Sequence, residues 1–461
     1  MNLQSIYDSS PYLIQSLAFK LYAERLRRLR EDRGLMEKLE FLSRMDSITR
    51  DELRHYQDKR LEKLILHCYE TVPYYNSIMR SLKLRPSDIR SVSDLPKLPL
   101  LTKEDVRKNL THLKSTKFNK RKLKKGSTSG TTGSPLVIYW DQDAWEWSHA
   151  FDWRQKVWGG MELGSKIGVL LGRMIVSTHR NKPPYWMWSK SLNQLWISSF
   201  HLSQSTVGDI YSALVDYGIE YLEGYPSTLY TLAQLMSEAG LRLNLKATFT
   251  SSEPLFDYQR NLIGEVFNCD NYDYYGLAEK VIWATECGHH ANKHLNMEYG
   301  ITEVVDSKGN AVGIGEEGFL VGTSLLNFGM PLIRYKTSDI SSIKDDCCEC
   351  GRASLMLNSV VTKDEDRIVT PSGKIISPSV LTHPFKPLTA LTKSQIVQES
   401  IDRVTIKLVS ESKITDDVKK HLILEVRKRI GDDIIVSVEQ VDTIEKGANG
   451  KYRWVVSRLH L

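Results

Sequence analysis

The chain has 461 residues, a hydrophobic fraction of 41% and a net charge of +6 from 62 Lys+Arg and 56 Asp+Glu. This mild positive excess is far below that of a nucleic-acid-binding surface, so we expect no nucleic-acid partner. The length predicts two or three domains, and no apolar run reaches the ~18 residues of a membrane span. The opening residues, MNLQSIYDSSPY, show neither a basic segment nor a small-residue cleavage site, which favours a cytoplasmic protein.

The first predicted element is a helix in SSPYLIQSLAFKLYAERLRRLRED. Ser10 is a suitable N-cap, and Pro11 suits the first helical position. Apolar residues recur at helical spacing and form one stripe: Leu13, Ile14, Leu17, Ala18 and Leu21. The pattern favours a helix docked on the domain surface. Because arginines crowd its end, a basic amphipathic helix resting peripherally on a membrane is the alternative.

Further helices are predicted in DELRHYQDKRLEKLILHCYETV, which Pro73 ends, and after Thr102, which forms a capping pattern with Asp105. We therefore expect an N-terminal helical region over residues 1–110. From there, short apolar strands such as KIGVLLG, KATFTSSEP and FLVGTSLL alternate with helical runs such as STLYTLAQLMSEAG. This alternation predicts a large α/β domain with mostly parallel sheets over residues 111–362. A ββαβ pattern then predicts a small α+β domain over residues 363–461.

A loop rich in Gly, Ser and Thr follows Lys124, in KKGSTSGTTGSPLVIYW. Its glycines would let a ligand approach the backbone closely, and its hydroxyls would donate to phosphate oxygens. It is not a Walker loop, because Ser134 and not Lys follows Gly133. From the residues alone, a phosphate-holding loop and a flexible linker or structural turn are both open.

The stretch STSGTTGSP closely resembles the signature loop of the adenylate-forming (ANL) superfamily, which includes acyl-CoA synthetases, peptide-synthetase adenylation domains and luciferases. The resemblance implies that the loop holds the β- and γ-phosphates of ATP. The loop residues concerned are Thr128, Ser129, Gly130, Thr131, Thr132 and Gly133.

Two further stretches resemble motifs of this superfamily in the expected order. DYYGLAEK is similar to its aromatic-Gly-x-x-Glu motif, which implies that Tyr275 stacks on adenine beside Gly276 and that Glu279 serves Mg²⁺. SSEPL is similar to the segment that lines the adenine edge. That segment is Ser252, Glu253 and Pro254.

The C-terminal part continues the resemblance. MPLIRYKTSDI implies that Asp339 accepts the ribose hydroxyls, and EKGANGKYRWVV implies that Lys451 completes the adenylation site. VTKDEDRIV places Asp366 at the domain hinge, although Thr362 and Lys363 stand where the superfamily usually has Gly and Arg. The resemblance therefore implies Lys451 and Glu279 as catalytic residues.

Within the superfamily, segments such as EGYPSTL and SLLNFGMPLIRYKTSD resemble the phenylacetate–CoA ligase-like branch, particularly relatives associated with capsule and surface polysaccharides. The resemblance implies an enzyme that forms an acyl-adenylate from a small carboxylate and ATP, then transfers the acyl group to CoA. Two alternatives stay open: an amide-forming carboxylate–amine ligase in polysaccharide biosynthesis, and a non-catalytic nucleotide-binding protein. EGYPST and Tyr225 are candidates for the acyl pocket. Trp186 and Trp188 either shape that pocket or pack at the surface.

Cysteines and histidines gather in TECGHHANKHLN and DDCCECGR. Four such ligands bind Zn²⁺ tetrahedrally, but from the residues alone reduced structural cysteines are equally open. Zinc-containing relatives show C…H…C-x-C, which implies a structural Zn²⁺ site of Cys287, His294, Cys348 and Cys350. Cys347 and His289 are the spare candidates.

Overall fold

The structure is a computed structural model. It describes residues 7, 10–30, 33–119, 121–128, 136–173, 175–177, 180–360, 368–372, 375–376, 381, 383–385, 388, 391, 393–410, 412–444 and 453–459.

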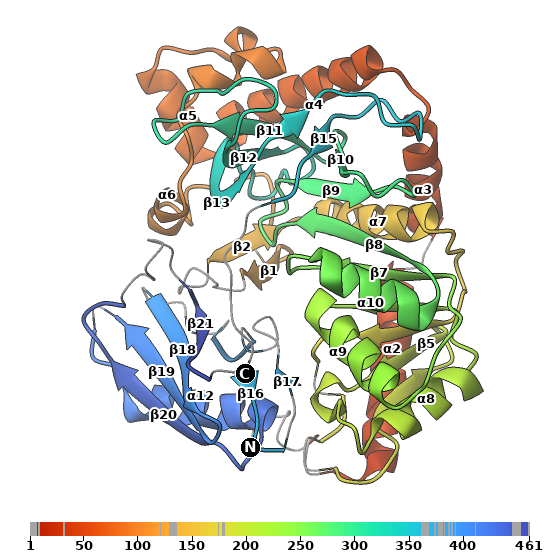
Figure 1. The fold of residues 1–461 in the computed structure, drawn as a ribbon. Helices are drawn as coiled ribbons and strands as arrows, with labels where there is room; N and C mark the ends of the chain where they lie inside the picture. The colour runs from red at the N-terminus through yellow and green to blue at the C-terminus, as the bar shows by residue number, and fades with distance from the viewer. Residues whose placement is uncertain are drawn as a thin grey trace.

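The N-terminal region is helical (Figure 1). Thr49 and Thr102 each begin a helix with a full capping box, closed by Glu52 and Asp105 respectively, as the sequence predicts for Thr102. The helices of this region are α2 (Tyr12–Arg30), α3 (Arg33–Met45), α4 (Arg50–Thr71), α5 (Pro73–Ser81) and α6 (Lys103–Lys108), with the 3₁₀ turns η1 (Pro86–Asp88) and η2 (Val92–Lys97).

Helix α2 docks on the large domain through a different face from the one that its apolar stripe predicts. Phe19, Ala23 and Leu26 are buried, and the ring of Phe19 packs edge-on against Trp196 at 5.4 Å. The stripe itself faces outward, with 81% of Leu13 and 68% of Leu21 exposed. The prediction of a helix docked on the domain surface is therefore confirmed, although the apolar stripe is not the face that docks. The aromatic contact, which the periodicity does not reveal, selects the opposite face.

Among the described residues, ten strands form the central sheet, in the order β14-β15-β10-β9-β8-β7-β6-β3-β5-β4. The segment β5-β3-β6-β7-β8 is parallel, and the remaining pairings are antiparallel. The strands are β3 (Ile167–Leu170), β4 (Trp186–Ser189), β5 (Gln194–Ile197), β6 (Tyr221–Gly224), β7 (Ala247–Ser251), β8 (Asp270–Gly276), β9 (Trp283–Glu286), β10 (Lys293–Leu295), β14 (Ile343–Lys344) and β15 (Met356–Leu357).

Helices cover both faces of this sheet, because successive side chains of a strand point to opposite sides. On one face, Phe151 of α7 (Gln142–Trp158) packs in a core with Tyr221 and Phe249, to which α2 also contributes. On the other face, Leu222 packs with α8 (Val207–Asp216), α9 (Pro226–Glu238) and α10 (Asp257–Phe267). Figure 1 shows α8, α9 and α10 in front of the sheet and α2 behind it.

Two smaller antiparallel units complete the large domain. One is the sheet β11 (Gly300–Val305), β12 (Gly318–Ser324) and β13 (Tyr335–Ser341), and the other is the hairpin β1 (Lys124–Ser127) with β2 (Val137–Trp140). FLVGTSLL is therefore a strand of an antiparallel sheet, since β11 and β12 join through a short connection with no crossover helix.

The C-terminal part folds around its own core. Its described strands form a sheet in the order β20-β19-β18-β21 that packs against α12, with Trp454 fully buried. The elements are β18 (Lys393–Ser400), β19 (Arg403–Val409), α12 (Asp416–Ile430), β20 (Ile435–Gln440) and β21 (Val455–Ser457). They are preceded by β16 (Ile368–Val369), β17 (Ile375–Ile376) and η4 (His383–Phe385). The 3₁₀ turn η3 (Ser199–His201) belongs to the large domain. The predicted fold class is confirmed. The domain limits remain predictions, and the hinge residue Asp366 lies outside the described residues.

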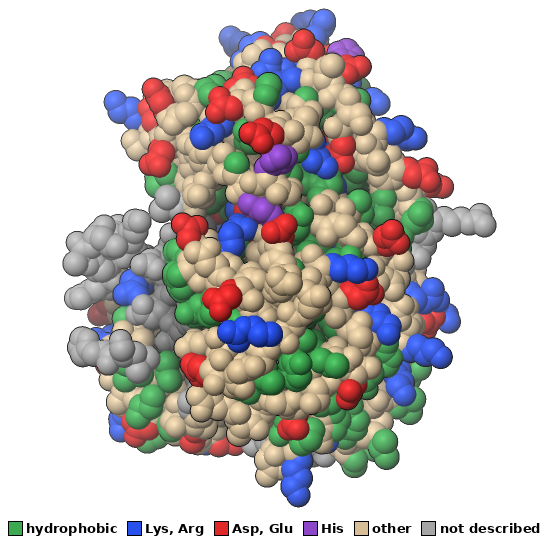
Figure 2. Space-filling model, turned by 45° about the vertical axis from the view of Figure 1, so that its right-hand side comes forward, with side chains coloured by type: hydrophobic (Ala, Val, Ile, Leu, Met, Phe, Trp, Pro, Cys, Tyr) green, Lys and Arg blue, Asp and Glu red, His purple; other side chains and the backbone are tan. Residues whose placement is uncertain are grey.

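Positive and negative side chains are interspersed on the face that Figure 2 shows, in keeping with the small net charge. None of the helices in the described part of the chain has both the length and the apolar character that crossing a membrane requires.

Candidate functional site

The glycine-rich loop connects β1 and β2. Thr128 closes this hairpin: its backbone N–H donates to the carbonyl of Leu136, and its hydroxyl accepts from the N–H of Leu136, both at 3.0 Å. Thr128 is buried, so its first role is to fix the base of the loop. The other predicted phosphate-holding residues lie outside the described part of the chain: Ser129, Gly130, Thr131, Thr132 and Gly133.

Two predicted nucleotide-binding residues meet. Tyr275 lies near the end of β8, and its hydroxyl donates a 2.7 Å hydrogen bond to Oδ2 of Asp339 on β13. Burial, reinforced by the charge of Asp339, raises the pKa of Tyr275 well above its ordinary value, so the phenol stays protonated. The next residue, Gly276, leaves little room for a side chain, because a Cβ there would lie 3.3 Å from the rings of Trp283 and Tyr274.

Glu279 lies just beyond β8 in the same neighbourhood. The hydroxyl of Tyr335 donates a 2.9 Å hydrogen bond to Oε1 of Glu279. Burial raises the pKa of Glu279, while the positive charge of Lys103 and the Tyr335 hydroxyl oppose that rise and Asp339 adds to it. A desolvated carboxylate beside a second carboxylate is a hard oxygen donor suited to Mg²⁺, which binds through one or two carboxylates together with phosphate oxygens.

The predicted adenine-edge segment follows β7 in a strained conformation. Ser252 has φ of +70°, which non-glycine residues adopt rarely and mostly at functional positions. Glu253 accepts a 3.1 Å hydrogen bond at Oε2 from the backbone N–H of Ser227, at the start of α9. Glu253 is thereby oriented toward α9, and Pro254, which follows, is partly exposed.

Tyr225, the candidate acyl-pocket residue, lies between β6 and α9. Burial and the charge of Glu253 raise the pKa of Tyr225 to about 12. Tyr225 also packs against the C-terminal core, as Phe200 does. Trp186 and Trp188 belong to the edge strand β4 and pack on the α8–α10 side, where Trp188 lies 4.9 Å from the ring of Tyr217, which favours their packing role. Lys451 lies outside the described residues.

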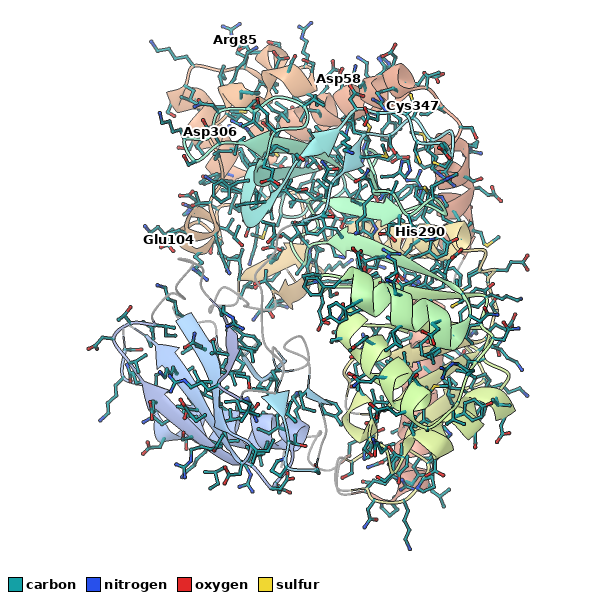
Figure 3. All side chains as sticks on the ribbon, viewed as in Figure 1. Asp58, Arg85, Glu104, His290, Asp306 and Cys347 are labelled. Atoms are coloured by element: carbon teal, nitrogen blue, oxygen red, sulfur yellow. The ribbon has the colours of Figure 1, made fainter. Side chains whose placement is uncertain are left out.

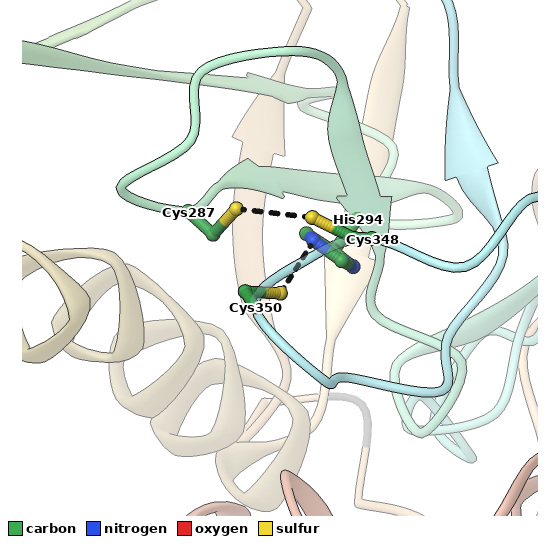
Figure 4. Close-up of side chains that lie close together, drawn as sticks. All are labelled: Cys287, His294, Cys348 and Cys350. Atoms are coloured by element: carbon green, nitrogen blue, oxygen red, sulfur yellow. Dashed lines mark hydrogen bonds between the residues drawn. The ribbon is translucent and has the colours of Figure 1, made fainter.

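The four predicted zinc ligands converge in the structure (Figure 4). Cys287 follows β9, His294 lies on β10, and Cys348 and Cys350 lie between β14 and β15. Their ligand atoms all fall within 4.8 Å of one another. Cys287 Sγ is 3.6 Å from Cys348 Sγ, and Cys350 Sγ is 3.3 Å from His294 Nε2.

These distances fit a tetrahedral zinc site. Bonds of about 2.3 Å to sulfur and about 2.05 Å to nitrogen place tetrahedral sulfurs roughly 3.8 Å apart and sulfur and nitrogen roughly 3.5 Å apart. His294 Nδ1 hydrogen-bonds Ser354 at 3.0 Å, which leaves Nε2 for a metal. Burial, with Arg352 and Arg154 nearby, lowers the pKa of His294 to about 4, so its ring is neutral as a ligand requires.

The spare candidates are not part of this cluster. Cys347 is exposed and is not one of the four clustered residues (labelled in Figure 3). His289 is exposed, with Nδ1 3.5 Å from Glu349.

The structure resembles solved adenylate-forming ligases. It matches the crystal structure of 2-hydroxyisobutyryl-CoA ligase in the postadenylation state with a TM-score of 0.58, at 19% identity, over 90% of this chain and 91% of that chain. Residues 368–458 match the family described as the CapK C-terminal domain. The molecule therefore has the fold of the adenylate-forming acyl-CoA ligases.

Sequence comparisons agree. The chain is 25% identical to protein CapK of Staphylococcus aureus over 99% of this chain and 100% of that protein. It is 25% identical to phenylacetate-coenzyme A ligase of Thermus thermophilus over 70% of this chain and 73% of the ligase. It is 23% identical to phenylacetate-coenzyme A ligase of Pseudomonas putida over 86% of this chain and 92% of the ligase. Over most of its length the chain is thus similar to phenylacetate–CoA ligases and to CapK.

Two neighbours of Glu279, Tyr335 and Lys103, escaped the sequence analysis, and both come from segments distant from it in the chain. Ser227, which contacts Glu253, belongs to the predicted acyl-pocket segment EGYPST. Tyr335 belongs to a stretch quoted for the resemblance, MPLIRYKTSDI, but nothing in that stretch marks it as a partner of Glu279.

Proposed function

We propose that this protein is an ATP-dependent ligase that activates a carboxylic acid as an acyl-adenylate and transfers the acyl group to CoA. The observation that carries the proposal is the meeting of three motif residues. Tyr275 is hydrogen-bonded to Asp339, and the charge of Asp339 acts on Glu279. Kinship with proteins named phenylacetate-coenzyme A ligase supports the same class of reaction.

In the first step, a carboxylate oxygen of the acid attacks the α-phosphorus of ATP. The bond from that phosphorus to the bridging oxygen breaks, and pyrophosphate leaves. The ring of Tyr275 would stack on adenine, with its hydroxyl oriented by Asp339, whose carboxylate would accept the ribose hydroxyls. The reaction is a displacement at phosphorus, so we assign its catalysis to positioning and charge neutralisation.

Magnesium bound at Glu279 would neutralise phosphate charge, and Tyr335 orients this carboxylate by donating to Oε1. The loop that begins at Thr128 is assigned to the β- and γ-phosphates. Lys451 is assigned to the α-phosphate and the substrate carboxylate. Both of these roles rest on the sequence motifs.

In the second step, the sulfur of CoA attacks the acyl carbon, the bond to the AMP oxygen breaks, and the thiol proton is released. An amine, the alternative that the sequence resemblance left open, is the second candidate acceptor, presented by the C-terminal domain after rotation about Asp366. With an amine, the product is an amide.

The test is carboxylate-dependent exchange of labelled pyrophosphate into ATP. We expect exchange with one class of acid, and Lys451→Ala should abolish it while retaining ATP binding. CoA and amines are then compared as acceptors by AMP release. Saturable ATP binding without exchange for any acid would instead support the non-catalytic nucleotide-binding alternative.

We also propose that Cys287, His294, Cys348 and Cys350 hold a structural Zn²⁺. The set is closed, with four protein ligands, as structural zinc sites are. Zinc there would join the β9–β10 hairpin to the segment between β14 and β15.

The outward apolar stripe of α2 is proposed as a peripheral membrane contact. Exposed basic residues border it at Lys20, Arg25 and Arg28, which suits a surface of anionic lipid. The cytoplasmic location stays a prediction.

A further inference from the structure

A buried ion cluster lies at the junction of α7 and the central sheet. Lys156, near the end of α7, is 5% exposed. Its Nζ donates to Oδ2 of Asp152 at 2.7 Å, one helical turn earlier, and lies 3.4 Å from Oε1 of Glu223 on β6. The two carboxylates retain some access to solvent, with side-chain exposures of 22% and 18%.

This cluster lies at the end of the sheet where ligands bind in open α/β folds. Glu223 is the penultimate residue of β6, and β6, β7 and β8 run parallel. Their carboxyl ends therefore face the same crevice, which is the ligand-binding place in such sheets. Tyr274, at the same end of β8, directly precedes the nucleotide-site residue Tyr275.

The charges of the cluster act on Tyr274, near the carboxyl end of β8. Tyr274 is hydrogen-bonded to Ser251, the last residue of β7. Burial raises the pKa of Tyr274, and the charges of Asp152 and Glu223 contribute to that rise. The cluster therefore acts on the end of β8 that also carries, on the opposite face of the strand, the ring proposed to stack on adenine.

A second, independent observation points to a polar ligand at this end of the sheet. Ser227, four residues after Glu223 and 7% exposed, has a buried hydroxyl with no hydrogen-bond partner within the described structure. The backbone N–H of Ser227 donates a hydrogen bond to the carboxylate of Glu253. A buried hydroxyl without a partner is costly and unusual unless a ligand or water supplies one.

An apolar acid would be a poor occupant here. Enclosing an aryl or alkyl group against Lys156, Asp152 and Glu223 would remove the remaining water from the carboxylates without replacing its hydrogen bonds. Hydroxyl or amino groups on the ligand would donate to those carboxylates and satisfy Ser227. Sites built to hydrogen-bond a substrate also discriminate strongly against analogues that lack the group.

We propose that the acid activated by this protein carries hydroxyl or amino groups near its carboxylate, recognised by Asp152, Lys156, Glu223 and Ser227, and is not a plain aryl or alkyl acid. The inference rests on the proposed ligase function and narrows its substrate class.

The first experiment compares acids of matched skeleton in pyrophosphate exchange with the wild-type full chain. The pairs are gluconate with hexanoate, glucuronate with cyclohexanecarboxylate, and β-alanine with propionate, with phenylacetate as the aryl reference. We expect kcat/KM to be at least about tenfold higher for the donor-bearing member of at least one pair. Equal or faster exchange with the apolar members would overturn this inference and leave the proposed ligase function unaffected. No exchange with any acid would overturn the proposed function itself, and with it the inference.

Two variants distinguish recognition from a purely structural ion cluster. Glu223→Gln preserves shape, and Ser227→Ala removes only the hydroxyl that lacks a partner, so both should fold. We expect each to raise KM for the polar acid about five- to tenfold more than it raises KM for the apolar counterpart. An equal loss for both acids would assign the cluster to holding α7 on β6 and overturn the proposal.

Discussion

The hydroxyl of Tyr275 donates a hydrogen bond to Asp339, 64 positions further along the chain. Tyr275 lies in the ten-stranded sheet and Asp339 in the three-stranded sheet, so the pair connects the two sheets at the proposed nucleotide site. The ring expected to stack on adenine and the carboxylate expected to hold the ribose are therefore oriented by each other.

Replacing Tyr275 by Phe should weaken ATP binding while keeping the stacking ring. Loss of a hydrogen bond to a charged group costs about 1.5 kcal/mol, so we expect the Kd for ATP to rise roughly tenfold, and further in Asp339→Ala. Isothermal titration calorimetry measures this directly. Tyr217→Phe, on the other side of the sheet, is the control and should bind normally. Unchanged ATP affinity in both site variants would contradict the nucleotide-binding assignment.

Glu279→Gln should abolish most activity and yet stabilise the ligand-free protein. Burial raises the pKa of Glu279 above its ordinary 4.5, so the unfolded chain loses this proton at lower pH than the folded one. Stability therefore falls as pH rises through that interval, and the penalty is fully present above the folded-state pKa of Glu279. Glutamine cannot ionise and still accepts from Tyr335.

We accordingly expect a higher melting temperature for Glu279→Gln at pH 7, with the difference shrinking as pH falls toward 4.5. Pyrophosphate exchange should fall about 100-fold or more. Glu162→Gln, at an exposed position, is the matched control and should change neither quantity. A variant less stable than wild type at pH 7 would refute the buried-charge argument.

Sequence motifs identified Tyr275, Glu279 and Asp339 because their residue types and order are specific. The contact between Tyr275 and Asp339 was not predictable, since it joins strands of different sheets. Tyr335 was missed for the same reason, as a tyrosine in a strand is an ordinary core residue. The stripe of α2 misled because periodicity identifies an apolar face but not what covers it. FLVGTSLL was recognisable as a strand, but its sheet depends on partners far along the chain.

Zinc content should depend on Cys348 and not on its neighbour Cys347. We expect purified protein to carry one zinc per chain by elemental analysis, and Cys348→Ser to lose it. Since structural zinc contributes to folding directly, the melting temperature should fall by about 5 °C or more. Cys347→Ser, which alters an exposed thiol next to the cluster, should retain both zinc and stability. Equal zinc content in the two variants would exclude this ligand set.

The stripe of α2 can be tested with vesicles. Replacing Leu13, Leu17 and Leu21 by Gln should lower partitioning onto phosphatidylserine-containing vesicles at least about tenfold, because burying even one leucine contributes about 1.5 kcal/mol. Co-sedimentation measures the bound fraction, with phosphatidylcholine vesicles to assess the role of charge. Leu424→Gln with Leu66→Gln, both at exposed sites elsewhere, is the control. Equal partitioning of the triple variant and the wild type would rule out this contact.

The four predicted zinc ligands lie at the edge of the central sheet where the strands become short. β10 has three residues, while β14 and β15 have two each, so the sheet ends in strands that offer little free backbone for pairing. Brief edge strands of this kind prevent one molecule from extending the sheet of another. A zinc ion held by these four residues, as proposed, would fasten the short strands and help to keep this edge from pairing with another molecule. If the ion were lost and the short strands detached, the four-residue strand β9 would become the edge of the sheet.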